Sequence, residues 1–589
     1  MGRKPSGKPS IDRIRRVQKN GDVYVYERTR IFDVETHKYS SSQKLLGRLP
    51  DGEEDVYGLL LPTRPKRKAS NPSIDKPIHS VTITESAKLH TGMIDIVSNI
   101  CDYSGLYTIF NSFLCDEIGI QQKILTCAWY DFATDGDTWP GITNWTTKYQ
   151  GLLPYSHGPI TKNMYHTLFA EIGTREDIKI GLFQKLCDGL EDETLLALDS
   201  STFFTESENL VNARNAVHKD GQIKNVYKIV YFYAINCRKP VAYAIIPGNI
   251  PDSETVYNAL VQLQMLKLTH VEIVSDNGYC TEPVISLYLE KEQPFLTRIE
   301  ADIKWISPIV EKNRSKLEHG WVIMECDPKF SGYKTSIQRT FIRKYEEKGK
   351  TIEKEINGKV NVFIYYSSVN KAKDDVYFRD TFKEYKDDLL LGRYLGDDQK
   401  KVDAFAKKYM VIERDNCGNI IKIVPNKAAC EKKLKNSGYL VLLSNKETDL
   451  EKALINFRER EYIEETIKNF KGHTGGRKPR VWNDDTLDGE VFVQFISLIM
   501  HDSFESRIKK LKSTLALPNG NIEHDTTEVL KIESKLKSFL YRNSLHDVLH
   551  WFDAIVTREY YEKDSDTKWE TVTETTKRDK LFLNLLGIV

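Results

Sequence analysis

Four short runs of almost continuous apolar residues lie in the middle of the chain. Each run has the length of a strand, and apolar side chains at both odd and even positions indicate a β-strand covered on both faces. The stretch SETVYNALVQLQML, which precedes the last run, has helical spacing. The pattern therefore predicts a mixed α/β core. The four runs are Thr194–Ser201, Val226–Ile235, Pro240–Pro247 and His270–Asn277.

The pattern changes after residue 300. The segments TSIQRTFIRKY and KVNVFIYYSS alternate between apolar and polar positions, so residues 300–438 are predicted to form a β-rich insertion. The run Tyr439–Asn445 resumes the buried-strand pattern. A long helix is expected from Asp449 to about Lys471, and a second from about Leu487 to Leu511. Residues 194–299 and 439–515 are thus predicted to be two parts of one core.

The two ends of the chain differ from this core. Residues 1–61 combine basic residues with the alternating run VYVYERTRIF, which predicts a small β-rich module suited to DNA binding. Residues 62–83 are rich in Pro, Ser and basic residues and are interpreted as a linker. Helical spacing dominates residues 84–193. Residues 516–589 are assigned to a C-terminal tail region.

Charge is balanced over the whole chain but not at its start. The 589 residues include 85 Lys and Arg against 84 Asp and Glu, which excludes a uniformly basic coat for nucleic acid. Met1–Lys68 holds 16 basic and 9 acidic residues, a net charge of +7. This local excess indicates a polyanionic partner, and a flexible solvated arm is the alternative.

The sequence predicts a soluble protein of the cytoplasm. The longest apolar stretch, Val491–Met500, is well short of the ~20 residues that a membrane span requires. The charged N-terminus does not resemble a secretory signal. The nine cysteines are scattered and none has C-x-x-C spacing, so we expect reduced thiols and no zinc ribbon.

Two carboxylates follow directly from predicted buried strands. Asp199 lies in LLALDSST and Asp276 in VEIVSDNGY. An Asp at the carboxyl end of a strand faces the crevice where α/β sheets place ligands, although a single such Asp is more often a turn or capping residue. Two acids side by side repel each other unless a cation lies between them. Oxygen ligands without His or Cys favour Mg²⁺ or Mn²⁺.

The predicted helix that contains INFREREYIEETIKNFKG presents a third set of polar groups. Phe457, Arg460, Glu464 and Lys471 fall within about 60° of one another on a helical wheel. An ordinary solvated helix with an Arg460–Glu464 pair explains this spacing equally well.

The spacing F-x2-R-x3-E-x6-K resembles the Y-(2)-R-(3)-E-(6)-K signature of bacterial insertion-sequence transposases of the DDE class. Other segments resemble that family in the same order: LALDSST its first-Asp strand, VAYAIIPGNIPDSETV its P-G-N-x-x-D turn, and IVSDNGY its second-Asp strand. The similarity runs from about Leu195 to Leu511. Phe457 departs from the family, which has Tyr there, and so loses a phenolic hydrogen bond to DNA.

The resemblance implies an RNase H-like fold and a cut-and-paste DNA transposase. It implies that Asp199, Asp276 and Glu464 are catalytic and hold Mg²⁺ or Mn²⁺, with two ions expected. Phe457, Arg460 and Lys471 are expected to contact DNA. The implied partners are double-stranded DNA, as terminal inverted repeats and target, and further copies of the chain in a dimer or larger assembly. The implied location is the bacterial cytoplasm, at the nucleoid when the protein acts.

Two other functions stay open. One is a domesticated, non-catalytic DNA-binding relative, which predicts damaged carboxylates, and the other is an RNase H-fold nuclease that cleaves without joining. Basic segments at residues 2–5 and 475–480 resemble minor-groove hooks but are more often plain basic loops. Trp305 and Trp321 are candidates for stacking on an unpaired base, and a buried core position is the commoner role of Trp. The sequence has no Walker-type phosphate loop.

Overall fold

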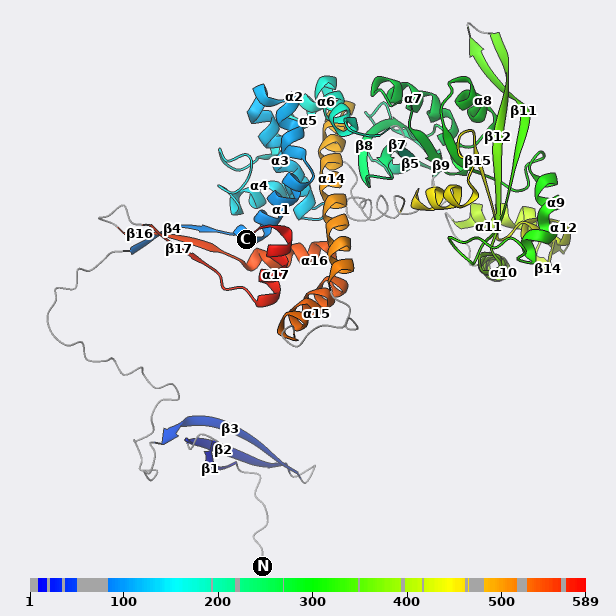
Figure 1. Cartoon of the computed structure of the whole chain (residues 1–589). Helices are drawn as coiled ribbons and strands as arrows, with labels where there is room; N and C mark the ends of the chain where they lie inside the picture. The colour runs from blue at the N-terminus through cyan, green and yellow to red at the C-terminus, as the bar shows by residue number, and fades with distance from the viewer. Residues whose placement is uncertain are drawn as a thin grey trace, which may run out of the picture. The chain divides into compact units, whose positions relative to one another are not determined.

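The computed structural model of the chain divides into two units, Met1–Thr82 and Ile83–Val589 (Figure 1). The structure describes residues 9–18, 22–33, 38–49, 83–191, 194–217, 223–268, 270–347, 350–392, 398–415, 418–460, 464, 481–515, 527–562 and 568–588. The predicted linker at 62–83 lies outside these residues, apart from its last position.

The first unit contains a three-stranded antiparallel sheet in the order β1 (Ser10–Val17), β2 (Val23–Asp33) and β3 (Lys38–Leu49). Val25 and Leu49 are its buried apolar side chains among the described residues. Most of β1 is exposed, and Arg28 of β2 pairs with Asp12 of β1 across the sheet. These strands lie within the segment predicted to form a basic β-rich module.

A nine-stranded sheet is the centre of the second unit. Its order is β11-β12-β15-β10-β9-β5-β7-β6, and β8 also pairs with β7. The strands β5, β9 and β10 run parallel, whereas β7, β8 and β15 run antiparallel to their neighbours. The strands are β5 (Leu195–Phe204), β6 (Arg214–Val217), β7 (Ile223–Ala234), β8 (Lys239–Pro247), β9 (Glu272–Ser275), β10 (Phe295–Ile299), β11 (Ser331–Glu347), β12 (Lys350–Tyr366) and β15 (Tyr439–Ser444).

The predicted apolar runs are the strands β5, β7, β8, β9 and β15 of this sheet. Leu196, Ala197 and Leu198 in β5 are completely buried, as expected for a strand that is covered on both faces. The prediction of a mixed α/β chain is confirmed. Helices and turns that connect these strands are α7 (Asp252–Met265), η3 (Asn277–Tyr279) and α8 (Glu282–Glu290).

A 31-residue helix, α14 (Asp484–Thr514), joins the sheet to the preceding helical region. It packs against α3, α5 and β8 and stands between the N-terminal helices and the sheet (Figure 1). Lys179 pairs with Asp488 at 2.9 Å, and Trp139 donates to Glu490 at 3.0 Å. The helices of this region are α1 (Thr91–Tyr103), α2 (Leu106–Phe113), η1 (Cys115–Glu117), α3 (Ile118–Ala133), η2 (Trp139–Gly141), α4 (Ile142–Lys148), α5 (Lys162–Thr174) and α6 (Glu176–Cys187).

The segment predicted as a β-rich insertion is mixed, which corrects that prediction. The long strands β11 and β12 extend the central sheet, as their alternating pattern indicated. The described part of the segment also contains α9 (Ser307–Glu318), α10 (Ser368–Leu391), α11 (Asp398–Tyr409), α12 (Lys427–Lys435) and the hairpin β13 (Met410–Arg414) and β14 (Ile420–Pro425). Leu389, Val402, Ala406, Met410 and Ile423 form a small core of their own there. The helices were missed because they are highly charged and bury few side chains; the described part of α10 buries Leu389 alone.

The C-terminal region is not a separate tail. Its strand β16 (Thr557–Glu562) pairs on one side with β17 (Lys568–Val572) and on the other with β4 (Ile83–Leu89), at the start of the same unit. A pairing between segments that lie more than 450 residues apart leaves no local sequence signal. The remaining elements are α15 (Thr527–Arg542), α16 (Leu545–Trp551), η4 (Phe552–Ala554) and α17 (Lys577–Leu586).

The sequence also predicts that no segment spans a membrane and that the cysteines are reduced. In the described part of the chain, no helix combines the length and the apolar character that crossing a bilayer requires. The cysteines described there are all free thiols.

Candidate active site

Asp199 and Asp276 lie at the same level of two adjacent parallel strands. The β5–β9 register pairs Leu195 with Glu272 and ends with Ala197 opposite Val274. Two residues further on come Asp199 and Asp276. Asp276 directly follows the end of β9, as predicted, whereas Asp199 lies within β5, which continues to Phe204 because it stays paired with β7. The sheet therefore brings together the two acids that the sequence places after separate apolar runs.

The next parallel strand adds a basic residue to this level. The β9–β10 register ends with Thr297 opposite Ser275, so Arg298 follows at the level of Asp276. Arg298 Nη1 lies 3.9 Å from Asp276 Oδ1. Arg298 cannot be predicted from the sequence, because nothing local distinguishes it from other arginines at a strand end.

A helix at residues 450–460, with Glu464 also helical, covers this edge of the sheet. Ala453, Leu454 and Phe457 are buried in the main core. Glu451 near its start accepts hydrogen bonds from the backbone N–H groups of Glu325 and Cys326, both at 2.9 Å. These contacts fix the rotation of the helix about its axis.

Arg460 connects this helix to the sheet. Its side chain is buried, with the whole residue 4% exposed. Its Nη1 pairs with Glu464 one turn later, and its Nη2 lies 3.8 Å from Asp276 Oδ1. The guanidinium also lies 5.1 Å from the centre of the Phe457 ring. Arg460 thus points toward Asp276 and holds Glu464 beside it. Phe457 is 3% exposed and packs in the core, so its ring is not accessible for the DNA contact predicted for it.

The charges of Glu464 and Arg460 also act on Asp199. The pKa of Asp199 is raised to about 6, mainly by burial and also by the negative charge of Glu464, while the positive charge of Arg460 opposes this rise. Asp276 and Glu464 therefore both lie beside the Arg460 guanidinium, and Asp199 is near enough for the charges of Glu464 and Arg460 to affect its pKa, although these acids come from three distant parts of the chain.

A fourth acid, Asp252 at the start of α7, lies behind this group. It accepts hydrogen bonds from Ser200 Oγ and Lys228 Nζ, both at 3.0 Å, and its charge also raises the pKa of Asp199. The preceding turn needs Gly248, because a Cβ there would lie 2.1 Å from the Val226 carbonyl oxygen. The P-G-N-x-x-D pattern of this turn is recognisable in the sequence, but the pattern alone predicts no role for its Asp.

The donor groups fit a hard divalent cation in their chemistry. The candidate ligands are all carboxylate oxygens, which favour Mg²⁺ or Mn²⁺. Asp276 Oδ1 is buried and accepts no hydrogen bond from the described residues. The repulsion between Glu464 and Asp199 is the kind that a bound cation relieves. Among the described residues, however, no three acidic, His or Cys side chains are close enough together to hold an ion, and Arg460 supplies the positive charge between them.

The remaining predicted DNA contacts are Lys471, two basic segments and two tryptophans. Lys471 and the hook-like segments at 2–5 and 475–480 lie outside the described residues. Trp305 packs against Phe341 and lies under the Arg339 guanidinium, 5.2 Å away. Trp321 is 78% exposed, so the core position considered for it is wrong.

Comparison with known proteins adds little. No protein-family model matches the chain, and no curated protein matches it. The piggyBac transposase, solved in a synaptic complex with hairpin DNA, aligns at a TM-score of 0.32 and 8% identity, over 80% of this chain and 86% of that chain. Similarity at this level carries no argument about this chain, so a function has to be argued from the residues of the site.

Proposed function

We propose that this protein is a DNA transposase of the DDE class, which cleaves the ends of a mobile element and joins them to target DNA. The observation that carries the proposal is the grouping of Asp199, Asp276 and Glu464 around Arg460. The sequence resemblance assigns the catalytic roles to these three acids, and their order and spacing are those of the family signature.

An RNase H-like core is the fold that we propose for the sheet. The antiparallel strands β5, β7 and β8 continue into the parallel strands β9 and β10. Asp199 belongs to the first of these strands and Asp276 follows the fourth, so both acids meet at one edge. This arrangement supports the proposal because phosphodiester chemistry needs its acidic groups close together.

Asp199, Asp276 and Glu464 are the residues that would hold divalent cations. Such ions activate the attacking oxygen and stabilise the leaving oxygen in phosphodiester cleavage and transfer. No side chain has to act as a covalent nucleophile, since water and then a 3′-hydroxyl of DNA are the attacking groups.

Arg460 and Arg298 have a different role in the proposal. Both guanidinium groups lie within 4 Å of Asp276 Oδ1, at 3.8 Å and 3.9 Å. Arginine binds phosphate through charge-assisted hydrogen bonds. Arg460 also holds the Glu464 carboxylate in place before DNA arrives. We propose that the two arginines attract the scissile phosphate toward the acids.

The test is an end-cleavage and strand-transfer assay with DNA that carries the element's own ends. Cleavage should require Mg²⁺ or Mn²⁺ and stop when a chelator is added. Joined products in the same reaction indicate a transposase, and cleavage without joining supports the nuclease alternative. Binding without cleavage at any metal concentration would support the non-catalytic alternative. Undiminished cleavage in excess EDTA would contradict the proposal.

Assembly is part of the proposal, because joining two element ends requires that both be held together. We expect a homodimer or larger complex on DNA. Sedimentation of the active protein–DNA complex measures this, and a fully active monomeric complex contradicts it.

A further inference from the structure

A cavity of about 760 Å³ lies where the helices of the insertion meet the edge of the central sheet. Its walls come from α10, α11, α12, the end of β10 with the residues that follow it (298–302), and the start of β15. The volume is within the roughly 300–1,000 Å³ range of pockets that hold small organic ligands. The proposed catalytic residues do not explain this cavity.

One wall of the cavity is aromatic. Phe405 is held by Phe378, Tyr385 and Tyr409, with ring centres 4.9 to 5.7 Å apart. Tyr377, which directly precedes Phe378 in α10, also lines the cavity and is 76% exposed. A fixed aromatic cluster beside an exposed ring is suited to stacking against a flat ligand.

The opposite wall is basic. Lys432 and Lys433, in the last turn of α12, line the cavity, and both are exposed. Neither has an acidic partner within ion-pair distance among the described residues, whereas Lys435 in the same turn pairs with Glu311 at 2.9 Å. Interaction with the carbonyl end of α12 accounts for part of this basic cluster, but it does not explain why two lysines face a cavity.

Two acids of the lining are engaged by the protein itself. Glu300 accepts a hydrogen bond from Asn277 at 2.9 Å, and Asp374 accepts one from the Gly438 backbone at 3.0 Å. The charges of Glu300 and Asp374 are therefore partly satisfied within the framework, and Asp302 is the third acid of the lining. Basic residues still outnumber the acids there: Arg298, Lys401, Lys408, Lys432 and Lys433.

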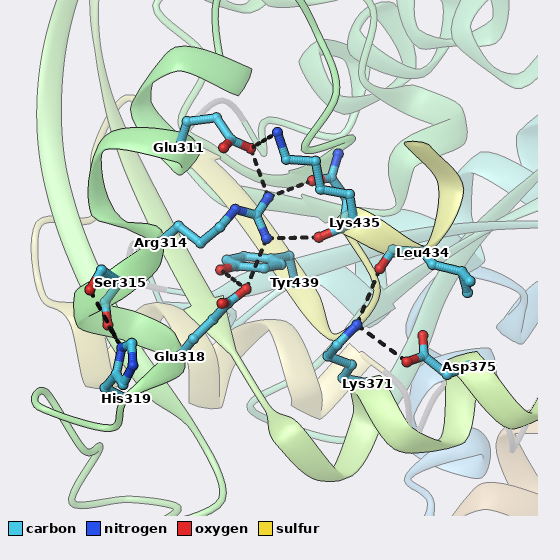
Figure 2. A network of polar contacts seen from close by, with 11 residues as sticks. Glu311, Arg314, Ser315, Glu318, His319, Lys371, Asp375, Leu434, Lys435 and Tyr439 are labelled. Atoms are coloured by element: carbon cyan, nitrogen blue, oxygen red, sulfur yellow. Dashed lines mark hydrogen bonds and ion pairs between the residues drawn. The ribbon is translucent and has the colours of Figure 1, made fainter. Parts of the chain in front are cut away.

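A polar network fixes the position of the basic wall. Figure 2 shows Arg314 of α9 at its centre, stacked on the Tyr439 ring at 4.8 Å. Arg314 pairs with Glu311 and Glu318 and donates to the Lys435 carbonyl at 2.7 Å. Lys371 reaches the Leu434 carbonyl and pairs with Asp375. These contacts hold the end of α12 against α9 and α10, so the cavity is formed before a ligand binds.

The cavity adjoins the candidate active site. Arg298 lines the cavity and also lies 3.9 Å from Asp276. Glu300, another lining residue, bonds to Asn277, which directly follows Asp276. A DNA strand at the acids would therefore have its next nucleotides within reach of the aromatic wall.

We propose that this cavity binds an unpaired nucleotide of a DNA strand. The base stacks on Tyr377 and the Phe378–Phe405 cluster, and Lys432 and Lys433 hold its phosphate. The proposal rests on the proposed function only in taking DNA as the polymer. A free nucleoside phosphate offers the same chemistry and is separated by the test below.

The test measures fluorescence anisotropy of a labelled oligothymidylate of about 12 nucleotides with the full-length protein. Tyr377→Ala should weaken binding about tenfold or more, since stacking on one aromatic ring has an effect of this order. Tyr257→Ala, which removes an exposed Tyr of α7 outside the cavity, is the matched control and should leave binding unchanged. The cavity side chains replaced in this arm and the next are Tyr377, Lys432 and Lys433. All three are exposed, so the variants should fold, and matching unfolding midpoints check this.

The second arm uses the lysines. Lys432→Ala with Lys433→Ala should reduce the slope of log affinity against log salt by about 0.7, the value for one neutralised phosphate on a single strand. Lys407→Ala, an exposed neighbour outside the cavity, should leave the slope unchanged. Unchanged oligonucleotide binding in both cavity variants overturns the proposal.

Direct binding of a free nucleotide then distinguishes the two sources of ligand. If thymidine monophosphate alone binds in a Tyr377-dependent way and the oligonucleotide does not, the cavity is a free-nucleotide site and the DNA proposal is wrong. Loss of oligonucleotide binding in the cavity variants supports the proposal even if the wild type does not cleave DNA. Normal end cleavage with unchanged oligonucleotide binding leaves the proposed function intact and removes the cavity proposal alone.

Discussion

Arg460 lies 3.8 Å from Asp276 while the same guanidinium pairs with Glu464. This side chain therefore places a positive charge beside two of the proposed catalytic acids, and Arg298 adds a second one at Asp276. Arg460 also links the helix at 450–460 to Asp276, directly after the end of β9. The proposed chemistry requires that a divalent cation and DNA phosphate compete with, or rearrange, these contacts.

Replacing Arg460 should strengthen metal binding. Two unit charges about 4 Å apart interact by up to about 4 kcal/mol at an effective dielectric constant of about 20, and solvent reduces this energy. The Arg460 charge should therefore oppose the binding of a cation at the acids. We expect Arg460→Gln to bind Mn²⁺ about tenfold more tightly in calorimetric titration without DNA. Arg458→Gln is the control, because Arg458 pairs with Asp327, at 2.8 Å, and not with the three acids. Weaker Mn²⁺ binding in Arg460→Gln would show that the acids do not form a cation site.

The contact between α5 and α14 gives a prediction about stability. A Cβ added at Gly489 of α14 would lie 2.0 Å from the Phe169 carbonyl oxygen of α5. Gly489→Ala should therefore push the helices apart and destabilise the protein by about 1–3 kcal/mol. Gly119 of α3 has open space around its Cβ position, so Gly119→Ala should be neutral or stabilising by about 0.5 kcal/mol. Unfolding midpoints of the two variants measure the difference, and equal midpoints contradict the close packing.

Asp502 of α14 should make stability depend on pH. It is 2% exposed, and burial raises its pKa to about 7, against the opposing effect of the hydrogen bond donated by Tyr233 at 2.7 Å. Between about pH 4 and pH 7 the folded state thus keeps a proton that the unfolded state has lost. Stability should fall as pH rises through this window, by up to about 4 kcal/mol.

Asp502→Asn removes this titration while keeping an oxygen that can accept from Tyr233. Its stability relative to the wild type should therefore increase from pH 4 to pH 8. Burial also raises the pKa of Glu272 to about 7. Glu272 is present in both proteins, so the effect of its titration cancels in the difference between their stabilities. Parallel stability curves for the two proteins would show that Asp502 does not titrate in this range.

The N-terminal unit should supply much of the affinity for element ends. Arg13, Arg15 and Arg16 of β1 are exposed, and Met1–Lys68 carries a net charge of +7 from 16 basic and 9 acidic residues. Deleting residues 1–68 should reduce the salt dependence of duplex binding by about 0.9 in log–log slope for each DNA phosphate that these residues neutralise. An unchanged slope would assign end recognition elsewhere, first to the helical region at 84–193.

Local sequence patterns predicted the part of the site that depends on strand ends and helix spacing. Asp199 and Asp276 follow apolar runs, and parallel pairing of β5 and β9 brings them to one level. Helical spacing of three and four residues brought Phe457, Arg460 and Glu464 to one face. These relationships are local, or follow from how parallel strands end.

Other parts of the site depend on contacts that no local pattern encodes. Arg298 belongs to the site only because β10 pairs with β9, and Asp252 only because its turn packs against Ser200 and Lys228. The cavity in the insertion was also missed. Its helices are charged on most faces, so their pattern does not distinguish them from solvated turns.

The role of Glu464 tests the central claim most directly. Glu464→Gln keeps the shape of the side chain and removes the charge that a hard cation requires. Cleavage of element-end DNA by this variant should fall more than about a hundredfold, equivalent to about 2.7 kcal/mol of activation free energy, while end binding stays nearly intact. Glu459→Gln on the same helix should cleave normally. If Glu464→Gln cleaves as well as the wild type in Mg²⁺, these three acids are not the catalytic site, and the proposed function fails.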